Sequence, residues 1–158
     1  MSPLVSVIIT TYNRCAMVGE AIESVLKQDF LDYEIIVVDD GSTDSTNDAL
    51  KKYNQVNYFY QENQGISRAR NQGLALSQGE FVCFLDSDDL WLPNKLAVQV
   101  SVMQENAALK LNYTDEIWIR KGRRVNPRKK HQKYSGWIFE KSLPLCIISP
   151  SSVMLRKE

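Results

Sequence analysis

Four short apolar runs alternate with segments of helical period over the first ninety residues, and this alternation limits the fold more than any other feature. The runs are residues 5–9, 33–38, 56–60 and 81–85. Each has the length and the β-branched or aromatic content of a strand, whereas apolar residues between them recur at helical spacing, as at Val18, Ile22 and Val25. Strands that alternate with helices predict an α/β fold: a mostly parallel central sheet flanked by helices on both faces, with right-handed crossovers.

Polar clusters follow three of the four predicted strands. They are Thr10 with Tyr12, Asp39 with Asp40, and Asp86 with Asp88. Ligands of such sheets bind beyond the carboxyl ends of the strands, at a switch in strand order. If the first strand lies between the second and the fourth, the clusters converge. Neighbouring strands are about 4.8 Å apart, so the outer two strand ends would lie about 10 Å apart, which suits a nucleoside diphosphate.

Three acids, Asp86, Asp88 and Asp89, come directly after the fourth apolar run. Carboxylates this close repel one another, and a divalent cation removes that cost. Oxygen ligands in an Asp-x-Asp arrangement suit Mn²⁺ or Mg²⁺, so the sequence predicts a metal–phosphate site at the end of this strand. An EF-hand calcium loop is excluded because Leu90 and Trp91 stand where that loop needs an oxygen ligand and a glycine.

Absent motifs and the cysteines narrow the class of protein further. No Gly-x-Gly-x-x-Gly follows the first strand and no Gly-x-x-x-x-Gly-Lys occurs, which argues against a dinucleotide dehydrogenase and a P-loop nucleotidase. A phosphatase of the haloacid-dehalogenase type stays an alternative, although its Asp-x-Asp belongs to the first strand of its domain. Cys83 lies inside the fourth run, where we expect a buried and unreactive thiol. Three cysteines without a Cys-x-x-Cys fit a reducing cytoplasm.

The charges of this 158-residue chain cancel overall but are unevenly distributed. Residues 120–133 hold eight Lys or Arg and no acid, and the remainder carries a net charge of −8. We expect this basic tract to be an exposed loop, with a tight turn at Lys121-Gly122-Arg123; attraction to an anionic acceptor or to a membrane surface is the alternative. A net charge of zero predicts no nucleic-acid partner. We see no signal peptide and no apolar run of about 20 residues, so we expect a cytoplasmic location, with the inner face of the membrane as the alternative.

Four motifs in this order resemble the family-2 glycosyltransferases of GT-A fold. The similar segments are residues 5–14, residues 34–44, residues 63–73 and residues 79–89. Residues 148–156 look like the segment that lines the acceptor side in that family. The resemblance implies a single GT-A (Rossmann-like) domain over residues 1–158, truncated at the C-terminus, with a nucleotide-binding half at 1–100 and part of an acceptor-side half at 101–158.

The resemblance also assigns roles to the polar residues at the strand ends. Thr10, Tyr12 and Asp40 would hold the nucleotide base, with Asp39 close by; Arg68 or Arg70 would approach the phosphates; Asp86 would lie near the ribose and the metal, and Asp88 would ligate the metal. A structural ion pair is an equally good reading of either arginine taken alone. The implied ligands are Mn²⁺ or Mg²⁺ and a nucleotide diphosphate sugar, with a UDP-sugar expected.

The implied reaction is an inverting transfer of the sugar to a hydroxyl of a saccharide, lipid-linked or polymer acceptor. The family's catalytic base would lie beyond Glu158, so no catalytic residue is assigned within the chain. A nucleotide-sugar-binding module without turnover is therefore the alternative. A shortened fold would also expose apolar surface, which leads us to expect a homo-oligomer. Any membrane association is expected to be peripheral.

Overall fold

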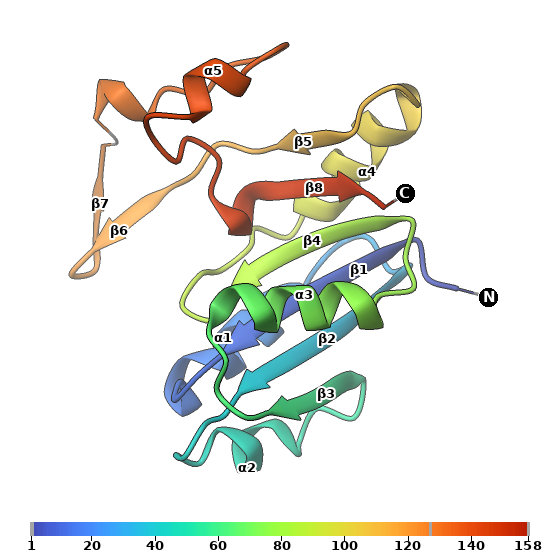
Figure 1. The fold of residues 1–158 in the computed structure, drawn as a ribbon, viewed down its shortest axis with the longest axis vertical. Helices are drawn as coiled ribbons and strands as arrows, with labels where there is room; N and C mark the ends of the chain where they lie inside the picture. The colour runs from blue at the N-terminus through green and yellow to red at the C-terminus, as the bar shows by residue number, and fades with distance from the viewer. Residues whose placement is uncertain (1, 127, 158) are drawn as a thin grey trace.

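The computed structural model describes residues 2–126 and 128–157. Met1, Pro127 and Glu158, the position beyond which the base is expected, lie outside the described residues. The centre is a six-stranded sheet of order β3-β2-β1-β4-β8-β5 (Figure 1). Its strands are β1 (Val5–Thr11), β2 (Tyr33–Asp40), β3 (Val56–Gln61), β4 (Phe81–Asp86), β5 (Leu111–Tyr113) and β8 (Val153–Arg156).

The strand order confirms that the first strand lies between the second and the fourth. β1 pairs in parallel with β2 and with β4, and β2 pairs in parallel with β3. β8 runs antiparallel to β4 and to β5, so the sheet is parallel except at one side. Because β4 and β8 are neighbours, the end of segment 148–156 belongs to the same sheet as the first half of the chain.

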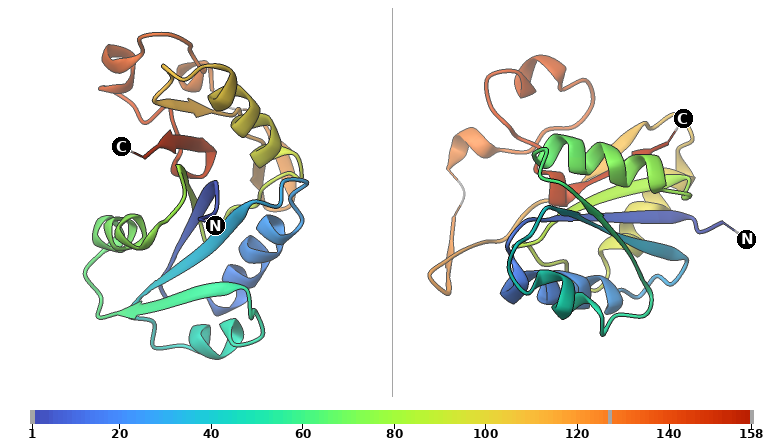
Figure 2. Two further views of the ribbon diagram at one scale, coloured as in Figure 1. Left: turned by 90° about the vertical axis from the view of Figure 1, so that its right-hand side faces the viewer. Right: turned by 60° about the horizontal axis from the view of Figure 1, so that its bottom comes forward.

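Helices cover both faces of the sheet, as the alternating pattern predicts. They are α1 (Cys15–Leu26), α2 (Thr46–Leu50), α3 (Ile66–Leu76) and α4 (Lys95–Glu105). Alternate side chains of β1 separate the two layers: Val7 and Ile9 pack with α1 and α4 in the larger core, while α3 lies on the opposite face (Figure 2). There Ala69 of α3 packs with Ile36 and Val38 of β2.

The turn between α3 and β4 differs from the sequence-based prediction. The helical spacing predicts a helix over residues 65–77 that is stopped by Gly79 in a left-handed conformation. Instead the helix ends at Leu76, and Gly79 lacks a positive φ. Its small size serves another purpose, because a Cβ atom here would lie 2.6 Å from the backbone nitrogen of Ser6.

The basic tract is only partly the loop that its composition predicts. A hairpin of β6 (Trp118–Arg120) and β7 (Arg123–Val125) reaches into the tract, which contains the last residue of β6 and all of β7. The tract continues with η1 (Lys129–His131). The predicted tight turn is present, since Lys121 and Gly122 both adopt positive φ and bring Arg120 opposite Arg123. The short α5 (Phe139–Ser142) and η2 (Pro150–Ser152) complete the fold.

Cys83 is fully buried in β4, as predicted. Burial raises the pKa of its thiol to about 11, so the thiol is protonated at neutral pH and unreactive. Within residues 2–126 and 128–157, no helix combines the length and the hydropathy that crossing a bilayer requires.

Candidate functional site

The carboxyl ends of β2, β1 and β4 form one edge of the sheet, where a cleft of about 380 Å³ opens. Thr10 lies opposite Val38 on one side and opposite Asp86 on the other. Five predicted site residues line the cleft together: Thr10, Tyr12, Asp40, Asp86 and Asp88. Sequence positions more than seventy residues apart therefore meet at one point, as the predicted strand order requires.

Asp40 organises the loop that precedes α3. Its Oδ1 accepts hydrogen bonds from Gln61 Nε2 at 2.6 Å and from the backbone N–H of Gln64 at 2.9 Å, and its Oδ2 accepts the N–H of Gly65 at 2.8 Å. Asn63 Nδ2 donates to the carbonyl oxygen of Asp40 at 2.9 Å. A carboxylate offers about four acceptor positions, so Oδ2 retains capacity for a donor in the cleft.

Asp39 is fully buried and does not line the cleft. It accepts hydrogen bonds from the backbone N–H of Ser42 and from the Tyr58 hydroxyl, both at 2.9 Å. Burial and the bond to Asp39 raise the pKa of Tyr58. Between the two aspartates and α3, Gly41 has a φ of 85°, and a Cβ there would lie 2.7 Å from the Asn63 nitrogen. Asp39 thus shapes the turn that presents Asp40.

The two arginines of α3 differ in their surroundings. Arg70 Nη2 lies 2.6 Å from Asp86 Oδ1, and each side chain is about a quarter exposed. Arg68 is exposed and donates to Gln64 Oε1 at 2.9 Å. Neither arginine lines the cleft in this structure. Arg70 therefore neutralises one of the predicted metal ligands, and its buried Nε has no partner among the described residues.

The acidic loop after β4 can share a cation with a ligand but cannot enclose one. Among the residues that the structure describes, no three His, Cys, Asp or Glu side chains cluster closely enough to hold a metal ion. Asp88 is exposed to the cleft and makes no hydrogen bond or ion pair with any described residue, and Arg70 occupies only one oxygen of Asp86. Mg²⁺ is commonly held by one or two carboxylates together with phosphates and water, so the pair fits a phosphate-bound cation.

Sequence reasoning did not assign seven further residues that line the cleft: Thr11, Arg14, Asn63, Gly65, Ile66, Ala69 and Ser87. Thr11 is 3% exposed, and its Oγ1 has no hydrogen-bond partner within the described residues. Buried hydroxyls are normally hydrogen-bonded, which makes this one a candidate ligand contact. Its position next to Thr10 at the strand end was the available signal.

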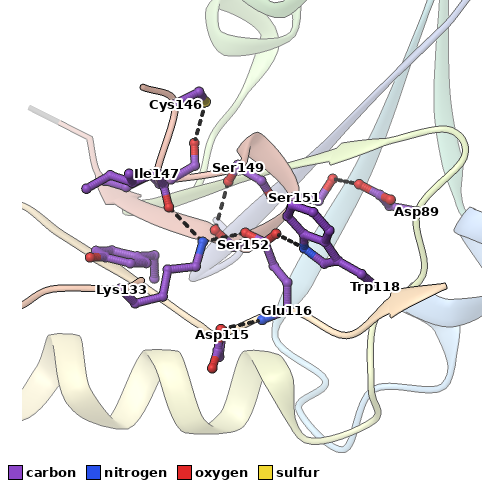
Figure 3. A network of polar contacts seen from close by, with 12 residues as sticks. Asp89, Asp115, Glu116, Trp118, Lys133, Cys146, Ile147, Ser149, Ser151 and Ser152 are labelled. Atoms are coloured by element: carbon purple, nitrogen blue, oxygen red, sulfur yellow. Dashed lines mark hydrogen bonds and ion pairs between the residues drawn. The ribbon is translucent and has the colours of Figure 1, made fainter. Parts of the chain in front are cut away.

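Ser151 connects the C-terminal segment to the acidic loop. Sequence reasoning also missed this contact. The Ser151 Oγ donates to Asp89 Oδ2 at 2.6 Å (Figure 3). The same Oγ accepts the backbone N–H of Asp86 at 3.1 Å, and the carbonyl of Ser151 accepts Trp91 Nε1 at 2.8 Å. Burial raises the pKa of Asp89; the hydrogen bond from Ser151 offsets part of this rise, and the charges of Asp86 and Asp88 add to it. The third acid of the motif is therefore a structural link.

A second network lies beside this link. Lys133 Nζ lies 2.5 Å from Glu116 Oε1 and donates to the carbonyl of Ile147 at 2.7 Å, while Trp118 Nε1 donates to Glu116 Oε2 at 2.9 Å (Figure 3). Burial alone would raise the pKa of Glu116, but the hydrogen bonds and the charge of Lys133 together lower it. Glu116 is thus ionised and held in place, and it fixes the segment before β6 to the segment before η2.

Comparisons with known proteins agree with this architecture. The family described as glycosyl transferase family 2 matches residues 6–158. A Rickettsia bellii protein named "Uncharacterized glycosyltransferase" is 37% identical over 153 residues, which is 95% of this chain and 22% of that protein. The chain thus spans about a quarter of the length of the curated relatives it matches first.

Two solved structures are similar as well. S. aureus TarS 1–349 in complex with UDP-GlcNAc has a TM-score of 0.75 and 28% identity, over 97% of this chain and 45% of that one. The mannosyltransferase PcManGT from Pyrobaculum calidifontis, in complex with GDP-Man and Mn²⁺, has a TM-score of 0.65 and 28% identity over 70% of this chain and 35% of that one. The sheet order, the cleft and the family match over nearly the whole chain lead to one conclusion: the chain belongs to glycosyltransferase family 2.

Proposed function

We propose that this chain binds the nucleotide diphosphate sugar donor of a metal-dependent, inverting glycosyltransferase, and that the donor is a UDP-sugar. The observation that carries the proposal is the cleft at the ends of β1, β2 and β4, where Tyr12, Asp40 and Asp88 come together. A similar structure, that of TarS, holds UDP-GlcNAc, which supports a uridine nucleotide.

The polar groups of the cleft suit the parts of such a donor. Tyr12 is 48% exposed at the cleft and can stack on a nucleobase, which is worth about 1–3 kcal/mol. The remaining acceptor capacity of Asp40 suits a base N–H, and the unpartnered Oγ1 of Thr11 suits a further polar contact. A nucleotide bound at this edge would therefore contact side chains, such as Asp40 and Thr11, that the fold already holds in position.

The diphosphate would lie towards the acidic loop. Asp86 and Asp88 would hold Mn²⁺ or Mg²⁺, which would stabilise the negative charge of the departing diphosphate. The Mn²⁺ complex of PcManGT supports this choice of metal. Arg70 would limit the repulsion between Asp86 and the phosphates, because it already neutralises that carboxylate.

A titration of UDP with and without Mn²⁺ tests the proposal. We expect the chain to bind UDP tightly only with the metal, and Asp88→Asn to weaken binding about 10–100-fold, the range seen for altered metal-site residues. Asp115→Asn is the matched control, because Asp115 is exposed and lies outside the cleft. Unchanged UDP affinity in EDTA would refute metal dependence, and no UDP binding under either condition would refute the donor site.

A second candidate is a binding module that holds the nucleotide sugar without transferring it. An inverting transfer needs a base for the acceptor hydroxyl. Three acids that come after the acidic loop or within it accept hydrogen bonds: Asp89 from Ser151, Asp115 from the Glu116 N–H, and Glu116 from Lys133 and Trp118. We assign none of them as the base. Release of UDP that depends on added acceptor would exclude the module without turnover.

A further inference from the structure

The hairpin β6–β7 carries like charges directly opposite each other. Arg120 pairs with Arg123, and Ile119 pairs with Arg124. Like charges at opposite positions destabilise a ribbon, and a hairpin of two three-residue strands has little stability of its own. Figure 1 shows this hairpin standing apart from the central sheet. Packing within the chain therefore does not explain why the sequence places cations here.

These cations have no counter-charge within the described part of the chain. Six exposed cationic side chains lie in the hairpin and around the start of η1. None of them makes an ion pair or a hydrogen bond with any described residue: Arg120, Lys121, Arg123, Arg124, Arg128 and Lys129. Lys133 differs, because it is paired with Glu116 and is part of the fold. The rest of the chain, outside residues 120–133, carries a net charge of −8, so the excess of positive charge lies in residues 120–133.

Large apolar side chains are exposed in the same part of the chain. Ile117 is 52% and Ile119 is 62% exposed, on and beside the hairpin. After η1, Trp137 is 83% and Phe139 is 59% exposed, with ring centroids 6.1 Å apart. We call residues 117–143 the basic arm, which includes α5; the right view of Figure 2 shows the hairpin and α5 extending away from the sheet.

We propose that the basic arm docks this chain on the surface of an anionic lipid bilayer. Exposed Lys and Arg next to Trp, Phe and Ile are typical of segments that bind at the membrane interface, where phosphates meet the cations and the apolar side chains enter the headgroup boundary. A soluble polyanion would neutralise the cations but would leave the isoleucines and Trp137 in water. The attraction is local, because the net charge of the chain is zero. The proposal is independent of the nucleotide site.

Flotation with lipid vesicles tests it, using phosphatidylcholine vesicles with and without about a third of phosphatidylglycerol. We expect flotation only with the anionic vesicles and a loss of flotation in high salt. Each cation near the surface contributes about a fivefold factor to binding, so Arg120→Gln/Arg123→Gln should bind about 25-fold more weakly. Lys27→Gln/Lys52→Gln removes two exposed cations elsewhere and should bind like the wild type.

A second pair of measurements separates the bilayer from a soluble acidic polymer. Ile119→Ser/Trp137→Ser should weaken vesicle binding about tenfold while leaving binding to dextran sulfate unchanged, because only the bilayer accepts apolar side chains. Thermal melting and UDP titration of every variant report on the fold and on the cleft separately. The proposal is wrong if anionic vesicles do not float the chain, if the control pair loses as much binding as the arginine pair, or if the chain binds dextran sulfate but no vesicles.

Discussion

The first hundred residues and residues 106–149 are stabilised in different ways. In the first region, β1 is buried along its whole length and the strands pack alternate side chains against α1, α4 and α3. In the second region, β5, β6 and β7 have three residues each, and α5 has no buried residue. The first region is held by burial of apolar surface, and the second is held largely by a few polar links such as Glu116 with Lys133.

This difference has a functional consequence. A rigid sheet can hold Thr10, Asp40 and Asp86 in fixed positions at its edge, as a nucleotide site requires. Residues 106–149 bury little apolar surface, so they can open locally at low cost while the sheet stays intact. A region that must meet a membrane or an acceptor can therefore move without disturbing the cleft.

The largest expected effect comes from matched phenylalanine truncations in the two regions. Phe81 is fully buried at the start of β4, whereas Phe139 is 59% exposed in α5. Phe81→Ala should lower the free energy of unfolding by about 3–5 kcal/mol, because it leaves a cavity in the core. Phe139→Ala should change it by less than about 0.5 kcal/mol. Urea denaturation measures both, and equal losses would show that the two regions share one core.

A second contrast uses aspartates. Asp40→Ala leaves two backbone N–H groups and the Gln61 amide without their acceptor, so we expect a loss of about 2–4 kcal/mol in urea denaturation together with a loss of UDP binding. Asp115→Ala removes one exposed acceptor from the second region and should cost less than about 0.5 kcal/mol. A stable Asp40→Ala variant that binds UDP normally would contradict the central role of this carboxylate.

The same contrast explains which parts of the fold and of the site could be predicted from the sequence. Apolar runs such as residues 81–85 predict strands because burial repeats along the chain, and the strand order then predicts that Thr10, Asp40 and Asp86 meet. The contacts of Ser151 with Asp89 and of Lys133 with Glu116 follow no such repeat, since each is made by single side chains 62 and 17 residues apart. The tight turn at Lys121-Gly122-Arg123 was predicted, but β7 was not, because the charge density of the basic tract indicates exposure and does not indicate backbone pairing.

The link at Glu116 predicts acid sensitivity confined to the second region. The pKa of Glu116 is lowered, so its contribution is complete above the ordinary carboxyl value of 4.5 and is lost as the pH falls through the lowered value. Glu116→Gln should destabilise residues 113–149 by about 1–2 kcal/mol at neutral pH and remove this acid dependence. Hydrogen exchange of amides in β6 and β7 measures it, with amides of β1 as the internal control. A uniform loss of protection across β1 would show that the two regions unfold together.

The smallest expected effect concerns a cation at the boundary of the two regions. Lys95 is 8% exposed at the start of α4; its Nζ lies 4.1 Å from the Trp91 ring centroid and is hydrogen-bonded to Gln99. Burial lowers the pKa of Lys95, so the unfolded chain binds its proton more tightly than the folded chain does. Stability should therefore rise as the pH increases from the lowered value towards the ordinary value of 10.5.

Lys95→Met keeps the shape of the side chain and removes this charge. At pH 7 we expect a change within about 1 kcal/mol, because relief of the buried charge offsets the lost hydrogen bond to Gln99. The diagnostic is the slope of stability against pH as the pH approaches 10.5, which should be smaller in Lys95→Met than in the wild type. Lys27→Met, an exposed control, should keep the wild-type slope. Identical slopes in all three proteins would mean that Lys95 is hydrated in solution and that α4 packs less tightly on the sheet than this structure shows.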